Sequence, residues 1–366
     1  MKIGIMTFPN MTSYGCTLQM YALYRAVEQA GGEAEIINYR NEYMKARRHT
    51  SAANNRSGLV GKLRLAAAKA LHMRQIIGFR NFERKMKQYP PRVTSDKAKL
   101  RKAAKRYDGV ICGSDQVWNP LIMNTDLSFF LNFCDAQTKR IAYAPSFGIS
   151  EFSDDFTEKI RPELNQFSHL SAREEVGARY VETLVGKKVE TVLDPTFLLC
   201  PEDWYRLEKK HPLASGNYVF CFPVRKSAAL IGFARELAEK KDATLVVAEG
   251  NFLTQLRNRD PRIRYALDLS PEEWLSLVHH ADCVVTNSFH GAAFSIHYQK
   301  DFFLEFSSAK ANSRLEQLVD LCGLQGRVIR DGCDAWDAHI CYADVQAHLA
   351  DARQASLDYL KQSIWQ

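Results

Sequence analysis

The sequence predicts an α/β protein made of two domains, each built on a parallel sheet. Two observations predict this class. Short apolar runs alternate with amphipathic helical segments along most of the 366 residues, and this order is typical of parallel sheets. The alternation is interrupted at 200–216, where Pro201, Pro212 and Gly216 gather. A chain of this length can give each of two domains its own core.

The first alternation covers residues 1–200. An apolar run at 2–8 predicts a strand, apolar residues at helical spacing over 17–30 predict a helix ended by Gly31, and 34–39 predicts the next strand. Strand, helix and strand at this spacing favour a parallel pair. The same criteria predict helices at 59–73, 76–86 and 152–167 and strands at 107–112, 140–144 and 189–193.

The second alternation covers residues 215–330 and is followed by a helical tail at 331–366. Its most clearly marked helix begins after Ser270 as N-cap, with Glu272 and Glu273 in the first turn. We expect strands at 218–222, 244–248, 283–286 and 302–306, and helices at 227–240, 271–280, 291–298, 313–322 and 343–365. We expect the two domains to face one another across a cleft, with ligands at the carboxyl ends of the strands.

The composition excludes several classes of protein. The nine cysteines include no Cys-x-x-Cys pair, and the closest two are eight positions apart, so neither a disulfide scaffold nor a zinc knuckle is indicated, and we predict no metal site. No apolar run approaches the roughly 20 residues of a membrane span. The first residues do not have the pattern of a secretory signal. We therefore expect a cytoplasmic protein.

The positive charge is concentrated in one segment. Residues 44–106 hold 19 Lys/Arg against Glu83 and Asp96, a net +17, while the remainder holds 30 against 40, a net −10. Three interpretations stay open: a solvated surface, a surface that docks on an anionic membrane, and a nucleic-acid site. The last is disfavoured because aromatic residues are not regularly interleaved.

Polar motifs follow three predicted strands of the first domain. The stretches 10–19, 113–120 and 143–148 each follow a predicted strand, and the first leads into a helix whose N-terminus can hold an anion or a sugar hydroxyl. Turn chemistry alone is the alternative for all three. Asp115 is the candidate base. The candidate binding residues are Tyr14, Gly15, Gln19, Ser114, Gln116, Trp118 and Ser146.

Two further motifs carry candidate cationic groups. Arg173, in 171–175, is a candidate clamp for a phosphate or carboxylate, and a solvated helix face is the alternative. His290 lies between a strand and a helix start, where backbone N–H groups and one imidazole would point at a ligand. Lys310 follows 20 positions later as a second cation. Asn287, Ser288, Phe289 and Gly291 complete this candidate set.

Taken together and in this order, the motifs resemble those of the polysaccharide pyruvyl transferase family. No single motif is specific for this family, but six motifs that follow one another in the family's order are specific. The stretches that carry the resemblance are 14–23, 113–119, 142–148, 171–174, 193–196 and 282–291.

The resemblance implies a fold similar to the GT-B glycosyltransferases, with two Rossmann-like domains. It implies transfer of the pyruvyl group of phosphoenolpyruvate to a sugar, such as galactose in a lipid-diphosphate-linked or polysaccharide precursor. Phosphoenolpyruvate is then a co-substrate, on the second domain, and no cofactor is needed. The family pattern assigns donor binding to Arg173, His290 and, by spacing alone, Lys310. Phe289 stands where some relatives carry a basic residue, so one donor contact is absent or supplied elsewhere.

The implied chemistry assigns roles to two groups. Protonation of the methylene carbon of phosphoenolpyruvate leaves a cation-like centre that a sugar hydroxyl attacks. His290 is the candidate acid or phosphate-binding imidazolium, and Asp115 the candidate base for the hydroxyl. Two rival functions stay open: a nucleotide-sugar glycosyltransferase of the same architecture, and a binding module that acts through the basic segment.

Overall fold

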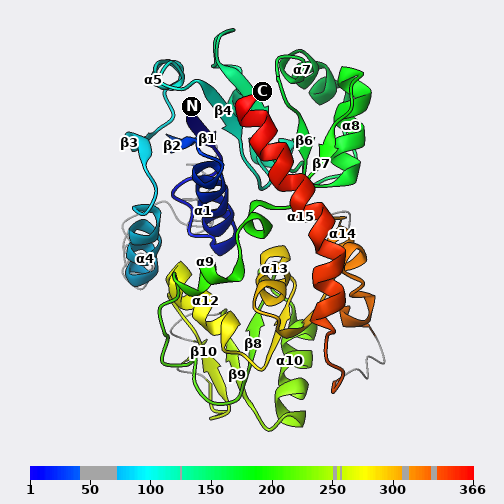
Figure 1. The fold of residues 1–366 in the computed structure, drawn as a ribbon. Helices are drawn as coiled ribbons and strands as arrows, with labels where there is room; N and C mark the ends of the chain where they lie inside the picture. The colour runs from blue at the N-terminus through cyan, green and yellow to red at the C-terminus, as the bar shows by residue number, and fades with distance from the viewer. Residues whose placement is uncertain (42–71, 124–125, 250–253, 256–257, 307–312, 331–335) are drawn as a thin grey trace. The chain divides into compact units, whose positions relative to one another are not determined.

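A computed structural model describes residues 1–41, 72–123, 126–249, 254–255, 258–306, 313–330 and 336–366 (Figure 1). The chain divides into two compact units. Unit 1 comprises Met1–His72, Phe79–Leu199 and Asp351–Gln366, and unit 2 comprises Met73–Gly78 and Cys200–Ala350. Among the described residues no helix is long and apolar enough to cross a membrane. The helix predicted at 59–73 lies almost entirely outside the described residues.

Unit 1 contains a five-stranded parallel sheet in the order β3-β2-β1-β4-β5. Its strands are β1 (Lys2–Met6), β2 (Glu33–Tyr39), β3 (Gln88–Thr94), β4 (Gly109–Cys112) and β5 (Lys139–Ala142). The central strand β1 pairs Ile3 with Ala34 on one side and with Gly109 on the other. Alternate residues of β1 enter different cores, because neighbouring side chains of a strand point to opposite faces.

The helices of unit 1 cover both faces of this sheet. Ile3 and Ile5 pack with residues of α1 (Tyr14–Gln29) and of α15 (Tyr342–Trp365). Met6 packs on the other face, in a core that holds residues of α5 (Lys97–Ala104), α7 (Asp154–Leu164) and α8 (Glu175–Val185). The unit also contains α6 (Pro120–Met123), the 3₁₀ turns η1 (Leu127–Phe130) and η2 (Pro195–Leu198), and a small parallel pair, β6 (Ser171–Ala172) with β7 (Glu190–Thr191). Helix α4 (Met73–Glu83) contributes residues to both units.

Unit 2 repeats the same strand order. Its parallel sheet runs β10-β9-β8-β11-β12. The strands are β8 (Tyr218–Phe222), β9 (Thr244–Val247), β10 (Ile263–Tyr265), β11 (Cys283–Thr286) and β12 (Asp301–Leu304). Besides the first part of α15, the helical elements among its described residues are α9 (Pro201–Tyr205), α10 (Ala228–Lys240), α12 (Pro271–His279), α13 (Phe289–His297), α14 (Ser313–Cys322) and η3 (Gln325–Arg327). Two Rossmann-like domains, as the sequence predicts, are confirmed.

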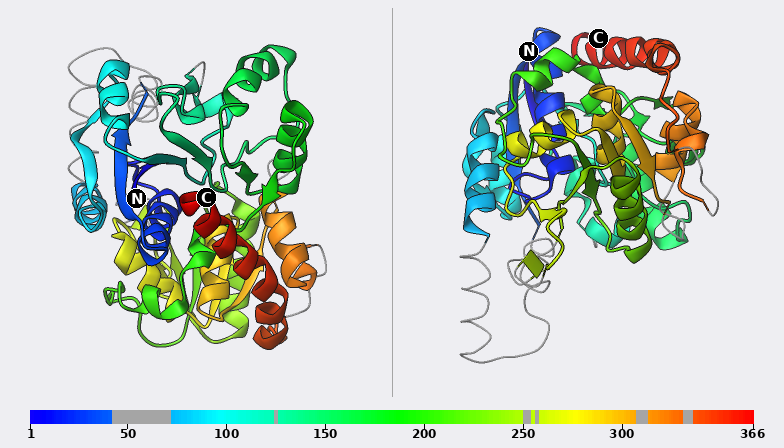
Figure 2. Two further views of the ribbon diagram at one scale, coloured as in Figure 1. Left: turned by 45° about the horizontal axis from the view of Figure 1, so that its top comes forward. Right: turned by 90° about the horizontal axis from the view of Figure 1, so that it is seen from below.

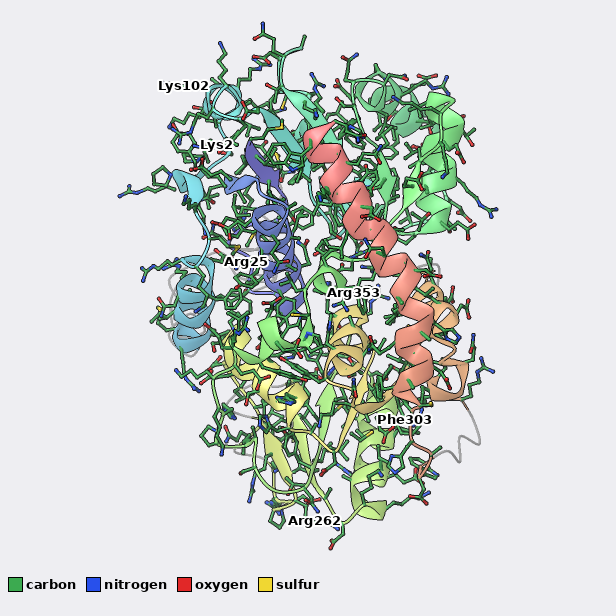
Figure 3. The ribbon with its side chains drawn as sticks, in the orientation of Figure 1. Lys2, Arg25, Lys102, Arg262, Phe303 and Arg353 are labelled. Atoms are coloured by element: carbon green, nitrogen blue, oxygen red, sulfur yellow. The ribbon has the colours of Figure 1, made fainter. Side chains whose placement is uncertain are left out.

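The end of helix α15 completes the core of unit 1 (Figures 1 and 2). Leu360 and Ile364 are fully buried beside the residues of β1 and α1. The Tyr359 hydroxyl donates to the carbonyl of Ala142 in β5 at 2.9 Å. Arg353, which is labelled in Figure 3, donates from Nε to the Phe197 carbonyl at 2.7 Å. The end of the predicted C-terminal helical tail therefore supplies one wall of the first sheet's core.

Several elements differ from the predicted ones. Strand β3 is not predicted, because Pro90 and Pro91 interrupt its pattern and proline is expected only at sheet edges, which is where β3 lies. The predicted strand at 189–193 is shortened to Glu190–Thr191, because it pairs with two residues of β6. Helix α5 is also unpredicted, although Asp96 caps it by accepting from Ala98 N at 2.8 Å.

Candidate active site

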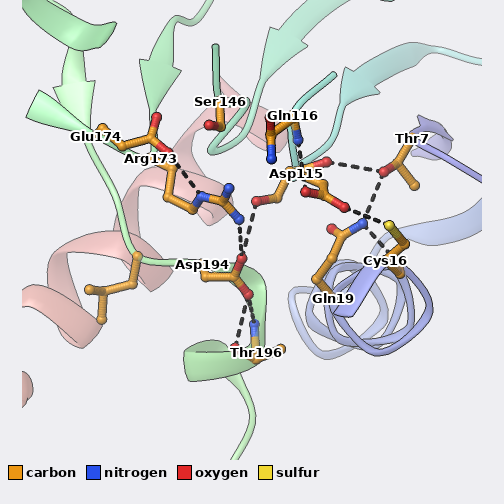
Figure 4. Close-up of polar contacts among 12 residues, drawn as sticks. Thr7, Cys16, Gln19, Asp115, Gln116, Ser146, Arg173, Glu174, Asp194 and Thr196 are labelled. Atoms are coloured by element: carbon orange, nitrogen blue, oxygen red, sulfur yellow. Dashed lines mark hydrogen bonds and ion pairs between the residues drawn. The ribbon is translucent and has the colours of Figure 1, made fainter. Parts of the chain in front are cut away.

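The polar residues of unit 1 gather at the switch point of its sheet. In the order 3-2-1-4-5 successive strands are added first on one side of β1 and then, from β4 on, on its other side, and ligands of such sheets bind beyond the carboxyl ends of the strands at this point. Thr7 follows β1 and Ser114 follows β4, and the Thr7 hydroxyl donates to the Ser114 carbonyl at 3.1 Å. Gln19 of α1 donates from Nε2 to Thr7 Oγ1 at 3.0 Å. Figure 4 shows the contact between the Gln19 and Thr7 side chains.

Asp115 is held in an unusual backbone conformation directly after this strand end. Its φ is +75°, a region that residues other than glycine adopt rarely, aspartate and asparagine more readily than most. Its carbonyl accepts from Ser146 N at 2.9 Å and from Val117 N at 2.7 Å, which hold the turn in place. Such conformations persist only where the surrounding structure enforces them, and they are frequent at functional sites. The turn therefore fixes the direction of the Asp115 carboxylate.

Cys16 of α1 is the immediate partner of that carboxylate. Its Sγ donates to Asp115 Oδ2 at 2.7 Å, while Asp115 Oδ1 accepts from Gln116 N at 2.9 Å. Burial raises the pKa of the Cys16 thiol well above its ordinary value, and the Asp115 carboxylate raises it further. The thiol is thus a neutral donor and not an activated nucleophile. The sequence alone does not mark Cys16 as a site residue, because its partner Asp115 lies 99 positions away.

Arg173 lies in the same cluster, at the end of β6. Its Nη1 donates to Asp194 Oδ2 at 2.7 Å and its Nε to Glu174 Oε1 at 3.3 Å. Burial by itself would lower the pKa of the Arg173 guanidinium, but the carboxylates of Glu174, Asp194 and Asp115 raise it above its ordinary value. The side chain is only 3% exposed, so the alternative of a solvated helix face is wrong for this residue.

Asp194 connects Arg173 to the strand end of β4. Besides the guanidinium, it accepts from Thr196 N at 3.0 Å, from Thr196 Oγ1 at 2.9 Å and from Ser114 Oγ at 3.4 Å. We call Cys16, Ser114, Asp115, Arg173 and Asp194 the switch-point cluster. With Glu174, it brings three carboxyl groups around one guanidinium, a formal surplus of negative charge that disfavours a trianionic ligand at this position.

Trp118 and Ser146 are buried and serve the packing of unit 1, not the binding of a ligand. The Trp118 ring is fully buried, stacks on Phe130 with ring centroids 5.1 Å apart and donates from Nε1 to the Phe129 carbonyl at 3.2 Å. It therefore offers no face to a sugar, which corrects the predicted stacking role. Ser146 is also fully buried, and its Oγ accepts from Gly148 N at 3.1 Å.

The remaining predicted residues of unit 1 surround α1 and the β4 turn. Tyr14 begins α1 and packs on Phe79 with centroids 5.2 Å apart, and Gly15 follows it in the first turn. Gln116 is partly exposed, and its Oε1 accepts from Asn119 Nδ2 at 2.6 Å. The structure thus gathers Ser114, Asp115, Gln116 and Gln19 near one strand end.

In unit 2, the β11 turn, Thr286–Gly291, occupies the equivalent switch point. The Thr286 hydroxyl donates to the Phe222 carbonyl at 2.7 Å and accepts from Ser288 N at 3.1 Å. Ser288 caps α13 by accepting from Gly291 N at 3.2 Å. A Cβ on Gly291 would lie 2.5 Å from Thr286 Oγ1, so only glycine fits there. These polar side chains are therefore engaged in building the turn.

Asn287 fixes this turn to its neighbours. Its Oδ1 accepts from Val224 N at 2.9 Å, and its Nδ2 donates to the Arg225 carbonyl at 2.8 Å and to Glu305 Oε2 at 3.3 Å. Glu305 follows β12 and also accepts from the Ser227 hydroxyl at 2.5 Å. Glu305, which no sequence motif predicts, thus places a carboxylate beside the predicted donor site.

His290 lies on the first turn of α13 and is 8% exposed. Its ring meets the Phe289 ring edge-on, with centroids 5.2 Å apart and planes at 87°. His290 and Arg173 belong to different units, and Arg173 shares its unit with Asp115. Lys310 lies outside the described residues.

Solved structures place this architecture among the GT-B proteins. A Listeria monocytogenes protein described as a UDP-N-acetylglucosamine 2-epimerase aligns with a TM-score of 0.53 and 11% identity, over 99% of this chain and 90% of that one. UGT89C1 of Arabidopsis thaliana aligns with a TM-score of 0.53 and 12% identity, over 99% of this chain and 98% of that one. At these identities the likeness shows the fold alone, a GT-B fold of two Rossmann-like domains.

The sequence identifies the family within this fold. The family model for polysaccharide pyruvyl transferase matches residues 14–304, so the chain belongs to the polysaccharide pyruvyl transferase family. No curated protein matches the chain. The matched range contains both the switch-point cluster and the β11 turn.

Proposed function

We propose that the protein is a ketal pyruvyl transferase that moves the pyruvyl group of phosphoenolpyruvate onto a hexose, such as galactose, and releases phosphate. The family match over residues 14–304 is the observation that carries this proposal. The proposed acceptor is a sugar of a polysaccharide precursor, with a lipid-diphosphate-linked form as one option.

We assign the acceptor hydroxyl to the switch-point cluster of unit 1. Asp115 is the proposed base, because its carboxylate sits at a strand end, in an enforced conformation, and is held by the Cys16 thiol at 2.7 Å. The net negative character of the cluster favours deprotonation of a neutral hydroxyl over binding of an anion. Arg173 then acts as a positioning residue. Its guanidinium is fixed by carboxylates and holds Asp194, which in turn accepts from the hydroxyl of Ser114, the residue before Asp115.

We assign the phosphoenolpyruvate to the start of α13 in unit 2. The first N–H groups of a helix favour an anion, and His290 lies among them. A proton delivered to the methylene carbon converts it to a methyl group and leaves a cation-like C2. The sugar hydroxyl forms the first C–O bond and loses its proton to Asp115. Phosphate leaves from C2, and a second hydroxyl closes the ketal as its proton passes to the departing phosphate.

The basic helix α5 supports an association with an anionic membrane, where a lipid-linked acceptor would lie. Leu100, Ala103 and Ala104 are buried, whereas the cationic residues of this helix and the turn after it are exposed. Those residues are Lys97, Lys99, Arg101, Lys102, Lys105 and Arg106. Binding to anionic vesicles should be strong at low salt and weak at high salt. No binding at low salt would reject this location.

One incubation tests the reaction class. The protein is mixed with phosphoenolpyruvate and hexosides or lipid-diphosphate-linked hexoses, and the products are followed by phosphate release and mass spectrometry. A mass gain of one pyruvyl unit, with one phosphate released per ketal, is expected. The rival function is that of a nucleotide-sugar glycosyltransferase. In such an enzyme the Glu305 carboxylate, at the end of β12, would be the acidic group that contacts the ribose of the donor. A gain of one hexose from a UDP-hexose, without use of phosphoenolpyruvate, would replace the proposal with that rival.

A further inference from the structure

A cluster of one carboxylate and two imidazoles lies in unit 2, apart from the residues discussed above. Helix α12 ends at His279, and His280 is its C-cap. Glu208 comes from the segment that follows α9, and its side chain is only 11% exposed. One potential ligand atom from each of the three residues lies within 4.8 Å of the others. From this arrangement we propose that Glu208, His279 and His280 bind a zinc-type divalent metal ion.

Both imidazoles lie near the Glu208 carboxylate, and His280 Nδ1 is 4.0 Å from Glu208 Oε2. His280 Nδ1 lies 2.9 Å from the Ser276 carbonyl, and because a carbonyl only accepts, this nitrogen carries the proton. Its Nε2 lone pair is then available, and a hydrogen bond from the other ring nitrogen to a backbone carbonyl is a common second contact of a metal-bound histidine. His279 Nδ1 lies 2.9 Å from Glu208 Oε1 and 3.0 Å from Oε2.

Neighbouring contacts hold the three groups in place without the metal. Tyr205 and Tyr298 each stack on the His279 ring with centroids 4.7 Å away, which restricts its rotation. Lys209 N donates to the Glu272 carbonyl at 3.1 Å, so the residue after Glu208 is fixed to α12. The site is therefore largely preformed.

The donor set and its location select the type of ion. Two nitrogens and one carboxylate suit Zn²⁺ and similar transition metals, whereas Ca²⁺ and Mg²⁺ prefer oxygen ligands alone. The C-terminal end of a helix also favours positive charge. Three protein ligands leave one position for water. The ion would join the segment after α9 to the end of α12.

Zinc binding to untagged, chelator-treated protein tests the proposal. Metal analysis after dialysis and calorimetric titration with Zn²⁺ should both give one equivalent, with a rise in Tm. His280→Ala should remove this equivalent without unfolding the protein, since its side chain is 45% exposed. Glu208→Gln, which keeps the size of the side chain, should weaken binding as well. The matched control is His339→Ala, which removes an exposed imidazole that pairs with Asp301 elsewhere in unit 2.

The spectrum of the Co²⁺-loaded protein distinguishes these ligands from the cysteines. Tetrahedral nitrogen and oxygen ligation gives visible bands without a sulfur-to-cobalt charge-transfer band. The proposal fails if wild-type protein binds no more zinc than His280→Ala, if His339→Ala loses the metal equally, or if the sulfur band appears. All of these readouts are independent of pyruvyl transfer, so they stand whether or not the proposed function does.

Discussion

Unit 1 and unit 2 share one strand order, yet the polar residues at their switch points make different kinds of contact. In unit 1, ionisable side chains meet there: Cys16 with Asp115, and Arg173 with Asp194. In unit 2, Thr286 and Ser288 close the turn with hydrogen bonds to backbone atoms. The same topology therefore presents a charged cluster in one unit and a helix start with one histidine in the other. We expect proton transfer from the acceptor to depend on unit 1 and anion binding to depend on unit 2.

The largest expected effect is at Asp115. Asp115→Asn tolerates the positive φ and keeps the shape of the side chain but removes the proposed base, so kcat should fall by about 10²–10⁴-fold with little change in Tm. Phosphate release measures kcat. The matched control is Asp242→Asn, an exposed aspartate of unit 2 with φ +47°, which should leave kcat unchanged. A kcat close to that of wild type would remove Asp115 from the reaction.

The corresponding substitution in unit 2 is His290→Ala. It should abolish pyruvyl transfer, a loss of about 10²–10⁴-fold if the imidazole acts as the acid, while the fold stays intact. Transfer is measured by product mass and the fold by circular dichroism. His339→Ala serves again as the control. Normal turnover in His290→Ala would contradict the assignment of the donor to this turn.

Replacement of Arg173 separates structure from donor binding. Arg173→Met leaves Asp194 and Glu174 buried without their cation, so the free energy of unfolding should fall by about 3–5 kcal/mol. Denaturant unfolding measures it. Arg179→Met, which removes an arginine that is 75% exposed and paired with Glu175, should change stability by about 0.5 kcal/mol or less. If Arg173→Met instead folds normally and raises only the KM for phosphoenolpyruvate, Arg173 is a donor ligand.

Two glycines of unit 2 give opposite expectations. A Cβ at Gly291 would lie 2.5 Å from Thr286 Oγ1 and disturb the β11 turn, so Gly291→Ala should destabilise the protein by about 1–3 kcal/mol. Gly232 lies within α10, where nothing is found within 4 Å of an added Cβ, so Gly232→Ala should stabilise it by about 0.5–1 kcal/mol. Thermal unfolding distinguishes them. Equal effects at both positions would show that the turn adapts.

The smallest expected effect is on the thiol of Cys16. Because its pKa is raised by burial and by Asp115, the thiolate is scarce at pH 8 and alkylation should be slower than at the exposed Cys341. Asp115→Asn removes one of these causes, so alkylation of Cys16 should become faster as its pKa falls. Peptide mass spectrometry over time gives both rates. An unchanged Cys16 rate would mean that burial alone protects the thiol.

The elements of the sheets could be predicted because their periodicity is local. The strands at 218–222 and 283–286 and the helix at 313–322 have the predicted bounds. Two of the four edge strands, β3 and β10, were not predicted, because β3 contains Pro90 and Pro91 and β10 has only three residues. Such strands carry few of the apolar residues on which prediction depends.

The site was less accessible to prediction, because its contacts join distant residues. Asp115 and Arg173 were selected from strand-end motifs, but their partners Cys16 and Asp194 are 99 and 21 positions away. Trp118 shows the reverse problem. A tryptophan beside polar residues suggested sugar stacking, whereas its ring lies in the core against Phe130. Motif composition does not reveal which side chains face inward.

The contribution of α15 to unit 1 has a consequence for synthesis in the cell. Leu360 and Ile364 pack beside Ile3 and Ile5 on the face that α1 also covers, so part of this face stays uncovered until residues 351–366 have left the ribosome. By then all of unit 2 has been translated. Nascent chains would thus carry a partly open apolar face for most of elongation, and chaperones that act during translation bind surfaces of this kind. Premature termination before residue 351 should send the whole chain to proteolysis and leave no active half.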